Sequence, residues 1–101
     1  MRAIQIDHFG GPEVLQFREL PDPIANKDEL LIDVSASGVN FADTHQVENS
    51  YLSQQTLPLI PGLEVVGRSS DGRGVVALVG GGGYADKVAS HKDLTFDVLD
   101  S

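Results

Sequence analysis

Turn-forming residues divide this chain into segments that suit only short strands. Its 101 residues include 11 glycines and 5 prolines, and alternating apolar stretches recur between them at intervals of about 8–12 residues. The clearest stretch is 29–38, where Leu30, Ile32, Val34 and Ala36 are expected on one face of a strand. This spacing predicts a mainly β fold built as a small barrel, and the length allows one domain at most.

The order of the expected elements follows from the same pattern. Residues 3–7 and 14–19 flank a Gly-Gly-Pro turn and are predicted to pair as a hairpin. Residues 40–47 lack alternation and are expected to form a short helix capped by Asn40, followed by a loop at 49–56. The remaining strands are predicted at 29–38, 64–68, 74–79, 84–89 and 94–98.

Charge and composition exclude several classes of function. Fifteen acidic residues against seven basic ones give a formal charge of -8. Because a phosphate backbone or an anionic lipid surface would be repelled, we expect neither a nucleic-acid nor a membrane partner. The chain has no cysteine, which removes disulfides and thiolate metal sites. With no signal peptide expected, these features favour the cytoplasm.

Three segments taken together are similar to a known family. They are Phe-Gly-Gly-Pro-Glu-Val-Leu at 9–15, Gly-Val-Asn-Phe-Ala-Asp-Thr at 38–44 and Leu-Ile-Pro-Gly-Leu-Glu-Val-Val-Gly at 59–67. The set resembles the start of zinc-free quinone oxidoreductases of the medium-chain dehydrogenase/reductase superfamily. The resemblance implies that residues 1–101 form a GroES-like barrel with one or two short helices. It also implies that the Rossmann domain, which binds NADPH in that family, is absent from this chain.

The resemblance implies a function for the intact enzyme. This domain would form the substrate side of an NADPH-dependent oxidoreductase that reduces quinones or activated alkenes by hydride transfer, and it would be inactive alone. Three alternatives stay open at this point. The barrel could be a standalone binding module, a subunit of a co-chaperonin-like oligomer, or one half of a two-chain reductase whose Rossmann domain is supplied in trans.

Two residues are expected to contact the cofactor. The resemblance implies that Asn40 lines the nicotinamide and substrate site, where its amide can both donate and accept hydrogen bonds. A role as a helix cap is the alternative for Asn40. Tyr51 falls where the family often has a tyrosine, whose ring could stack on a quinone or nicotinamide. The alternative for Tyr51 is an aromatic side chain that only anchors a loop.

The expected substrate contacts are Asn40, Asp43, His45, Tyr51 and Glu64. Asp43 matches the family segment, but it could equally serve the helix dipole. His45 takes a position that is often aromatic in the family, and a surface role is its alternative. Glu64 follows a Pro-Gly turn and corresponds to a residue near the active site of the related enzymes, or it is simply a turn carboxylate. No catalytic residue is assigned.

Neither a metal site nor a dinucleotide loop is expected. Asn40 and Leu63 stand where the zinc-dependent branch of the superfamily has a cysteine and a histidine ligand, and neither side chain can replace those ligands. The four glycines at 80–83 follow an apolar strand, as in a dinucleotide fingerprint. That motif requires a helix after the glycines, whereas the residues that follow here are predicted to form a strand.

Overall fold

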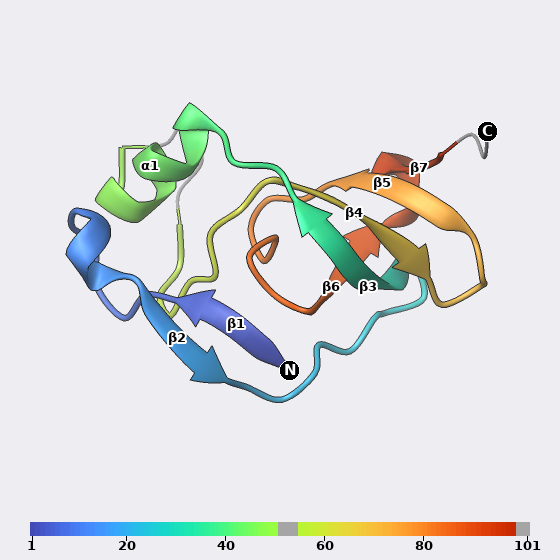
Figure 1. Cartoon of the computed structure of the whole chain (residues 1–101), viewed down its shortest axis with the longest axis horizontal. Coiled ribbons are helices and arrows are strands. Elements are labelled where there is room, and N and C mark those ends of the chain that lie inside the picture. Colours follow the sequence, from blue (N-terminus) through green and yellow to red (C-terminus); the bar gives the residue numbers. More distant parts are fainter. Residues whose placement is uncertain (51–54, 99–101) are drawn as a thin grey trace.

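The computed structural model describes residues 1–50 and 55–98, which form two lobes (Figure 1). The first lobe begins with an antiparallel pair, β1 (Arg2–Gln5) and β2 (Gln16–Glu19), separated by the 3-10 helix η1 (Pro12–Val14). The hairpin predicted from residues 3–7 and 14–19 is therefore confirmed. The helix α1 (Phe41–Glu48) lies over the same lobe and contacts η1.

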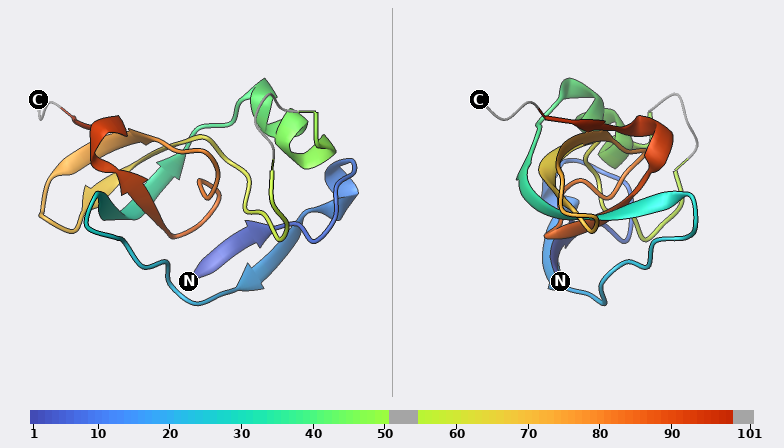
Figure 2. Two further views of the ribbon diagram at one scale, coloured as in Figure 1. Left: turned by 180° about the vertical axis from the view of Figure 1, so that it is seen from behind. Right: turned by 90° about the vertical axis from the view of Figure 1, so that its right-hand side faces the viewer.

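The second lobe is a five-stranded antiparallel sheet. Its strand order is β6 (Lys87–His91), β3 (Glu29–Ser37), β4 (Glu64–Ser69), β5 (Gly74–Leu78) and β7 (Thr95–Asp97). The two outermost strands, β6 and β7, are joined only by the 3-10 helix η2 (Lys92–Leu94). Because so short a connection cannot cross a flat sheet of five strands, the sheet curls toward closure, as Figure 2 shows end-on. The mainly β, small-barrel class predicted from the sequence is confirmed.

Each lobe has its own apolar cluster. Ile32, Val65, Val75, Ala77 and Val88 are buried inside the curl of the sheet. Ile6, Val14 and Val47 form the second cluster, against which Phe9 and Leu59 pack. These two small cores replace the single core that a domain of this length usually has.

One strand face differs from the expected alternation. Ile32 is fully buried, but Ala36, which was expected on the same face, is exposed. The pairing of β3 with β4 runs from Val34 opposite Gly67 to Ala36 opposite Val66, so Ser35 is an extra residue in a bulge. A bulge of one residue shifts the side-chain alternation, and it turns the end of β3 to the outer face of the sheet.

The predicted strand at 84–89 is wrong at its start, because β6 begins only at Lys87. The preceding segment pairs with β1 instead: the Ile4 N–H donates to the Tyr84 carbonyl at 2.9 Å, and the Asp86 N–H donates to the Arg2 carbonyl at 2.9 Å. Residues 84–86 therefore join the two lobes rather than extending one sheet. No helix among the described residues is long and apolar enough to cross a bilayer.

Candidate functional site

The helix α1 starts with a capping box made by the two residues that the sequence singled out. Asn40 occupies the N-cap with an extended backbone, and Asp43 is the third residue of the helix. The Asp43 carboxylate accepts a hydrogen bond from the Asn40 N–H at 3.0 Å. This arrangement satisfies amide groups that a helix start leaves without partners. The predicted helix and the N-cap position of Asn40 are thus confirmed, although the capping bond comes from the Asp43 side chain and the Asn40 side chain makes no capping hydrogen bond.

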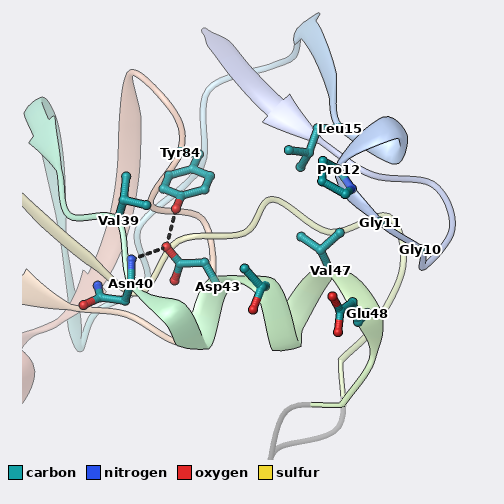
Figure 3. A pocket seen from close by; sticks show the side chains of 11 residues that line it. Gly10, Gly11, Pro12, Leu15, Val39, Asn40, Asp43, Val47, Glu48 and Tyr84 are labelled. Atoms are coloured by element: carbon teal, nitrogen blue, oxygen red, sulfur yellow. Dashed lines mark hydrogen bonds between the residues drawn. The ribbon is translucent and has the colours of Figure 1, made fainter.

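A cavity of about 280 Å³ lies between α1 and the turn that follows β1 (Figure 3). Most of its surface is apolar, since the turn at 10–12 and several aliphatic side chains border it. Its described lining residues are Gly10, Gly11, Pro12, Leu15, Val39, Asn40, Asp43, Thr44, Val47, Glu48 and Tyr84. The cavity is therefore an apolar space with a polar end beside the N-terminus of α1.

Tyr84 and Asp43 form the polar end of the cavity. The Tyr84 hydroxyl donates to the same Asp43 oxygen, Oδ2, that accepts from the Asn40 N–H (Figure 3). Burial, together with this hydrogen bond to the carboxylate, raises the pKa of Tyr84 well above its ordinary value, so the hydroxyl keeps its proton. Asp43 is only 5% exposed, and its other oxygen, Oδ1, has no hydrogen-bond partner within the described part of the chain.

Gln46, on the buried side of α1, connects the helix to other segments by hydrogen bonds. It is fully buried, and its side-chain oxygen accepts from the Gly62 N–H at 3.0 Å. Its amide nitrogen donates to the Gly80 carbonyl at 3.2 Å and to the Gln55 side chain at 3.3 Å. One side chain thereby ties α1 to two irregular segments that the sequence alone does not bring together.

Glycine is required at position 62, where the Pro-Gly turn comes close to the segment that contains Tyr84. Its φ of 106° lies in the region that L-residues with a side chain rarely adopt. A Cβ atom there would also come within 2.8 Å of the Tyr84 nitrogen. The Pro-Gly turn that precedes Glu64 is therefore part of the support for Tyr84.

The structure brings some of the predicted site residues together and not others. Asn40 and Asp43 both line the cavity. Glu64 is outside the lining set and begins β4, where its side chain lies against Gly38. His45 is also outside it: its Nδ1 lies 2.9 Å from the Ser50 hydroxyl, and its ring packs edge-on against Phe41. Tyr51 lies outside the described residues.

Sequence reasoning missed Tyr84 and the turn at 10–12 as parts of the site. Tyr84 is 41 positions from Asp43, and no local pattern links the two. The sequence pattern places it only at the start of an expected strand. The available signal was the pair of short Gly-rich segments, 10–11 and 80–83, because glycines mark points where the backbone turns sharply or approaches another segment. Among the described residues, no group of His, Cys, Asp and Glu is arranged to hold a metal ion.

Comparison with known proteins gives a consistent family. Residues 26–100 match the family described as the alcohol dehydrogenase GroES-like domain. The quinone oxidoreductase of Lama guanicoe is 44% identical over 68 residues, covering 66% of this chain and 21% of that protein. The quinone oxidoreductase of Rattus norvegicus is 36% identical over 108 residues, covering 95% of this chain and 33% of that protein.

Solved structures agree in fold. The quinone oxidoreductase of Thermus thermophilus, described with its NADPH complex, superposes with a TM-score of 0.90 at 39% identity, covering 100% of this chain and 33% of that one. The Escherichia coli quinone oxidoreductase complexed with NADPH superposes with a TM-score of 0.90 at 26% identity, covering 98% of this chain and 33% of that one. The chain thus spans between about a fifth and a third of the length of these relatives.

Proposed function

Because this chain belongs to the alcohol dehydrogenase GroES-like domain family, we propose that it is the substrate side of an NADPH-dependent oxidoreductase. The proposed reaction is the reduction of quinones or activated alkenes. NADPH, when bound, supplies the hydride. The other half of the active site would come from a Rossmann domain, in the same polypeptide or in a second one. The four relatives described above are quinone oxidoreductases, and the Thermus thermophilus and Escherichia coli structures are described with NADPH.

The observation that carries this proposal is the apolar cavity that ends at Asn40. A planar carbonyl compound needs an apolar space with a few fixed polar groups, and the cavity has that composition. Val39 and Phe41, which flank Asn40, are 84% and 79% exposed. Such large exposed apolar side chains are typical of a surface that another domain or a ligand covers.

Asn40 fits the nicotinamide end of NADPH by the chemistry of its side chain. A carboxamide donates and accepts at once, which complements the carboxamide of nicotinamide or the carbonyl of a substrate. In Figure 3 the Asn40 carboxamide points away from the Asp43–Tyr84 pair. The backbone of Asn40 is fixed by Asp43, so the amide is held on a rigid support. Tyr51 is proposed as a second contact for the cofactor and the substrate.

The remaining proposed substrate contacts differ in their distance from the cavity. Asp43 borders the cavity, so its contact would be direct or through the groups that it orients. His45 and Glu64 lie outside the cavity lining, beside Ser50 and at the start of β4. If they contact a substrate, it must extend past Asn40 toward the surface on which Val39 and Phe41 are exposed.

The phenol beside the cavity, Tyr84, is not suited to deliver a proton at neutral pH. Tyr84 is held protonated, because its raised pKa reflects both burial and its bond to Asp43. A quinone that receives a hydride becomes a hydroquinone anion, which then takes one proton from water. The domain would therefore contribute position and polarity rather than acid–base chemistry.

The absence of cysteine from the sequence favours a reducing cytoplasm as the compartment.

The test is a chimera in which residues 1–101 replace the matching third of the Thermus thermophilus quinone oxidoreductase. We expect the chimera to oxidise NADPH in the presence of 1,4-naphthoquinone, and the 101-residue chain alone to show no NADPH oxidation. Binding of NADPH and the circular dichroism of the chimera serve as controls for folding. A folded chimera that binds NADPH but reduces neither a quinone nor an enone would refute the proposal.

A further inference from the structure

We propose that the cavity between α1 and the turn at 10–12 selects small uncharged ring compounds and rejects anionic forms of the same ring. Glu48 is the proposed specificity-determining residue. The inference rests on the proposed function of this site, and it narrows the substrate class from quinones and enones in general to uncharged ones.

The size and the lining of the cavity set the first limit. Its volume of about 280 Å³ is just below the roughly 300–1,000 Å³ range of small-molecule sites, so it accommodates one small ring system. Pro12, Leu15, Val39 and Val47 supply aliphatic surface, and Tyr84 supplies an aromatic ring. Figure 3 shows Pro12 and Leu15 on the side of the cavity opposite α1. A flat apolar molecule would gain affinity by leaving water for this space.

The charged groups of the lining are acidic. Asp43 and Glu48 are the two ionisable carboxylates among the described lining residues. Asp43 is buried, and its Oδ1 atom has no partner within the described part. A carboxylate in such surroundings repels a second negative charge more strongly than it would in water, because the local dielectric constant is lower. An anionic ligand would therefore enter against two like charges.

No basic side chain in the described lining offsets these carboxylates. The described lining residues include no Lys, Arg or His, and residues 51–54 and 99–101 are Tyr-Leu-Ser-Gln and Leu-Asp-Ser. Several basic residues are already paired with other acids. These pairs are Arg2 with Asp86, Arg18 with Asp7, Arg73 with Asp71 and Asp97, and Lys87 with Asp33. The formal charge of -8 adds a long-range repulsion of the same sign.

Glu48 is the carboxylate that can be changed without disturbing the fold. It is the last residue of α1 and is exposed, whereas Asp43 caps the helix and holds Tyr84. Glu19, on β2, is also exposed and does not line the cavity. Replacement of Glu19 changes the net charge by the same amount as replacement of Glu48, so it is the matched control.

The test measures binding of two ligands to the 101-residue chain, without NADPH. They are 1,4-naphthoquinone, which is neutral, and 1,4-naphthoquinone-2-sulfonate, which carries one negative charge. Both are titrated into the ¹⁵N-labelled chain and followed by the amide shifts of cavity residues such as Val39 and Val47. The sequence has no cysteine, so no thiol adduct can form. We expect the neutral compound to bind at the cavity, and the sulfonate to bind about tenfold more weakly or not at all.

The variants then assign the selectivity to the site. Glu48→Lys is expected to strengthen sulfonate binding about tenfold relative to Glu19→Lys, and so to reduce the preference for the neutral quinone. Glu48→Gln should give an intermediate effect. Addition of salt should reduce the difference between the ligands. Equal affinity of the wild-type chain for both compounds, equal effects of Glu48→Lys and Glu19→Lys, or no binding of the neutral quinone would each overturn the inference.

Failure of this inference and failure of the proposed function can be told apart. The binding experiment does not use NADPH or the chimera, so its result concerns only the cavity. Selective binding together with an inactive chimera would refute the reductase and leave the inference standing. An active chimera that reduces the sulfonate as fast as the neutral quinone would refute the inference and leave the reductase standing.

Discussion

The two lobes of this domain are stabilised in different ways. Inside the curled sheet, Ile32, Val65 and Val75 form a core of aliphatic side chains. Beneath α1, a smaller apolar cluster is accompanied by the buried polar side chains of Gln46 and Asp43, whereas the buried polar residues of the sheet, Ser69 and Ser90, carry only small hydroxyl groups. The cavity lies in this helical lobe, whereas the sheet encloses a packed apolar cluster. The comparison indicates a division of roles. The sheet core supplies most of the stability, whereas the helical lobe combines a small core with buried polar contacts that orient the cavity residues.

The largest expected effect is in the sheet core. Ile32 is fully buried, so Ile32→Ala removes three carbon atoms and leaves a cavity, which should lower the free energy of unfolding by about 3 kcal/mol. Ile32→Val should cost about 1 kcal/mol. Urea unfolding measures both, and quinone binding below the transition should not change. A loss below about 1 kcal/mol for the alanine variant would contradict the assignment of the main core.

Loss of the Gln46 hydrogen bonds should have the next largest effect on the free energy of unfolding. Gln46→Leu leaves the buried Gly62 N–H without its side-chain partner, whereas the Gly80 carbonyl, on an exposed residue, can bond to water instead. Each buried group without a partner costs about 1–3 kcal/mol, so we expect a loss of about 2 kcal/mol in urea unfolding. Gln16→Leu, at an exposed position on β2, is the control. Equal stability of the two variants would show that Gln46 is not a structural tie.

Loss of the Tyr84 hydroxyl should have a smaller effect on stability and a specific local one. Tyr84→Phe removes one donor from Asp43 while the Asn40 N–H donor stays, so the expected loss is about 1 kcal/mol. Hydrogen exchange of the Asn40 amide should accelerate more than that of Ile32 in the sheet. Uniform acceleration of both amides would mean that Tyr84 acts only on global stability.

The pH dependence of stability should distinguish the wild-type protein from the Tyr84→Phe variant. The pKa of Tyr84 is raised in the folded state, so the protonated form is favoured by folding. Its contribution to stability is complete below the unfolded value, near pH 10, and it is lost as the pH rises above that value toward the folded pKa. The stability difference between wild type and Tyr84→Phe should therefore shrink above about pH 10. A difference that grows with pH would contradict the assigned environment.

The smallest expected effect is at an exposed ion pair of the sheet lobe. Arg73 contacts Asp97 at 2.6 Å, and both side chains are exposed. Surface pairs of this kind contribute little, because water and salt screen them and two side chains lose freedom. Asp97→Asn should leave the urea midpoint unchanged within error. A clear shift of the midpoint would show that β7 depends on this pair for its place at the sheet edge.

Sequence reasoning predicted the sheet lobe better than the cavity lobe, for a physical reason. Strands such as β4 alternate between a buried and an exposed face, and that period is visible in the letters around Val65. The error at Ala36 came from a bulge, which changes the period without any turn residue to mark it. Even so, most strands, the hairpin and the helix start could be found locally, whereas the start of β6 could not, because residues 84–86 pair with β1.

The cavity could be predicted only in part. Asn40 and Asp43 were predicted as site residues from the family resemblance of segment 38–44, and the helix start that they share was visible in the sequence as well. Tyr84 and Gln46 were not found, because their partners come from segments far apart in the chain that meet through single hydrogen bonds. Long-range contacts of this kind have no period in the sequence. The resemblance to a family pointed to Asn40 and Asp43, but it did not indicate Tyr84 or the turn at 10–12, which border the same cavity.

The most direct test of the central claim is where a neutral quinone contacts this chain. Intermolecular nuclear Overhauser effects should be measured between 1,4-naphthoquinone and the methyl groups of the protein. The account predicts contacts to Leu15, Val39 and Val47 of the cavity and none to Val65 or Val75 of the sheet core. Contacts confined to the outer face of the sheet, at Val66 and Phe96, would contradict it.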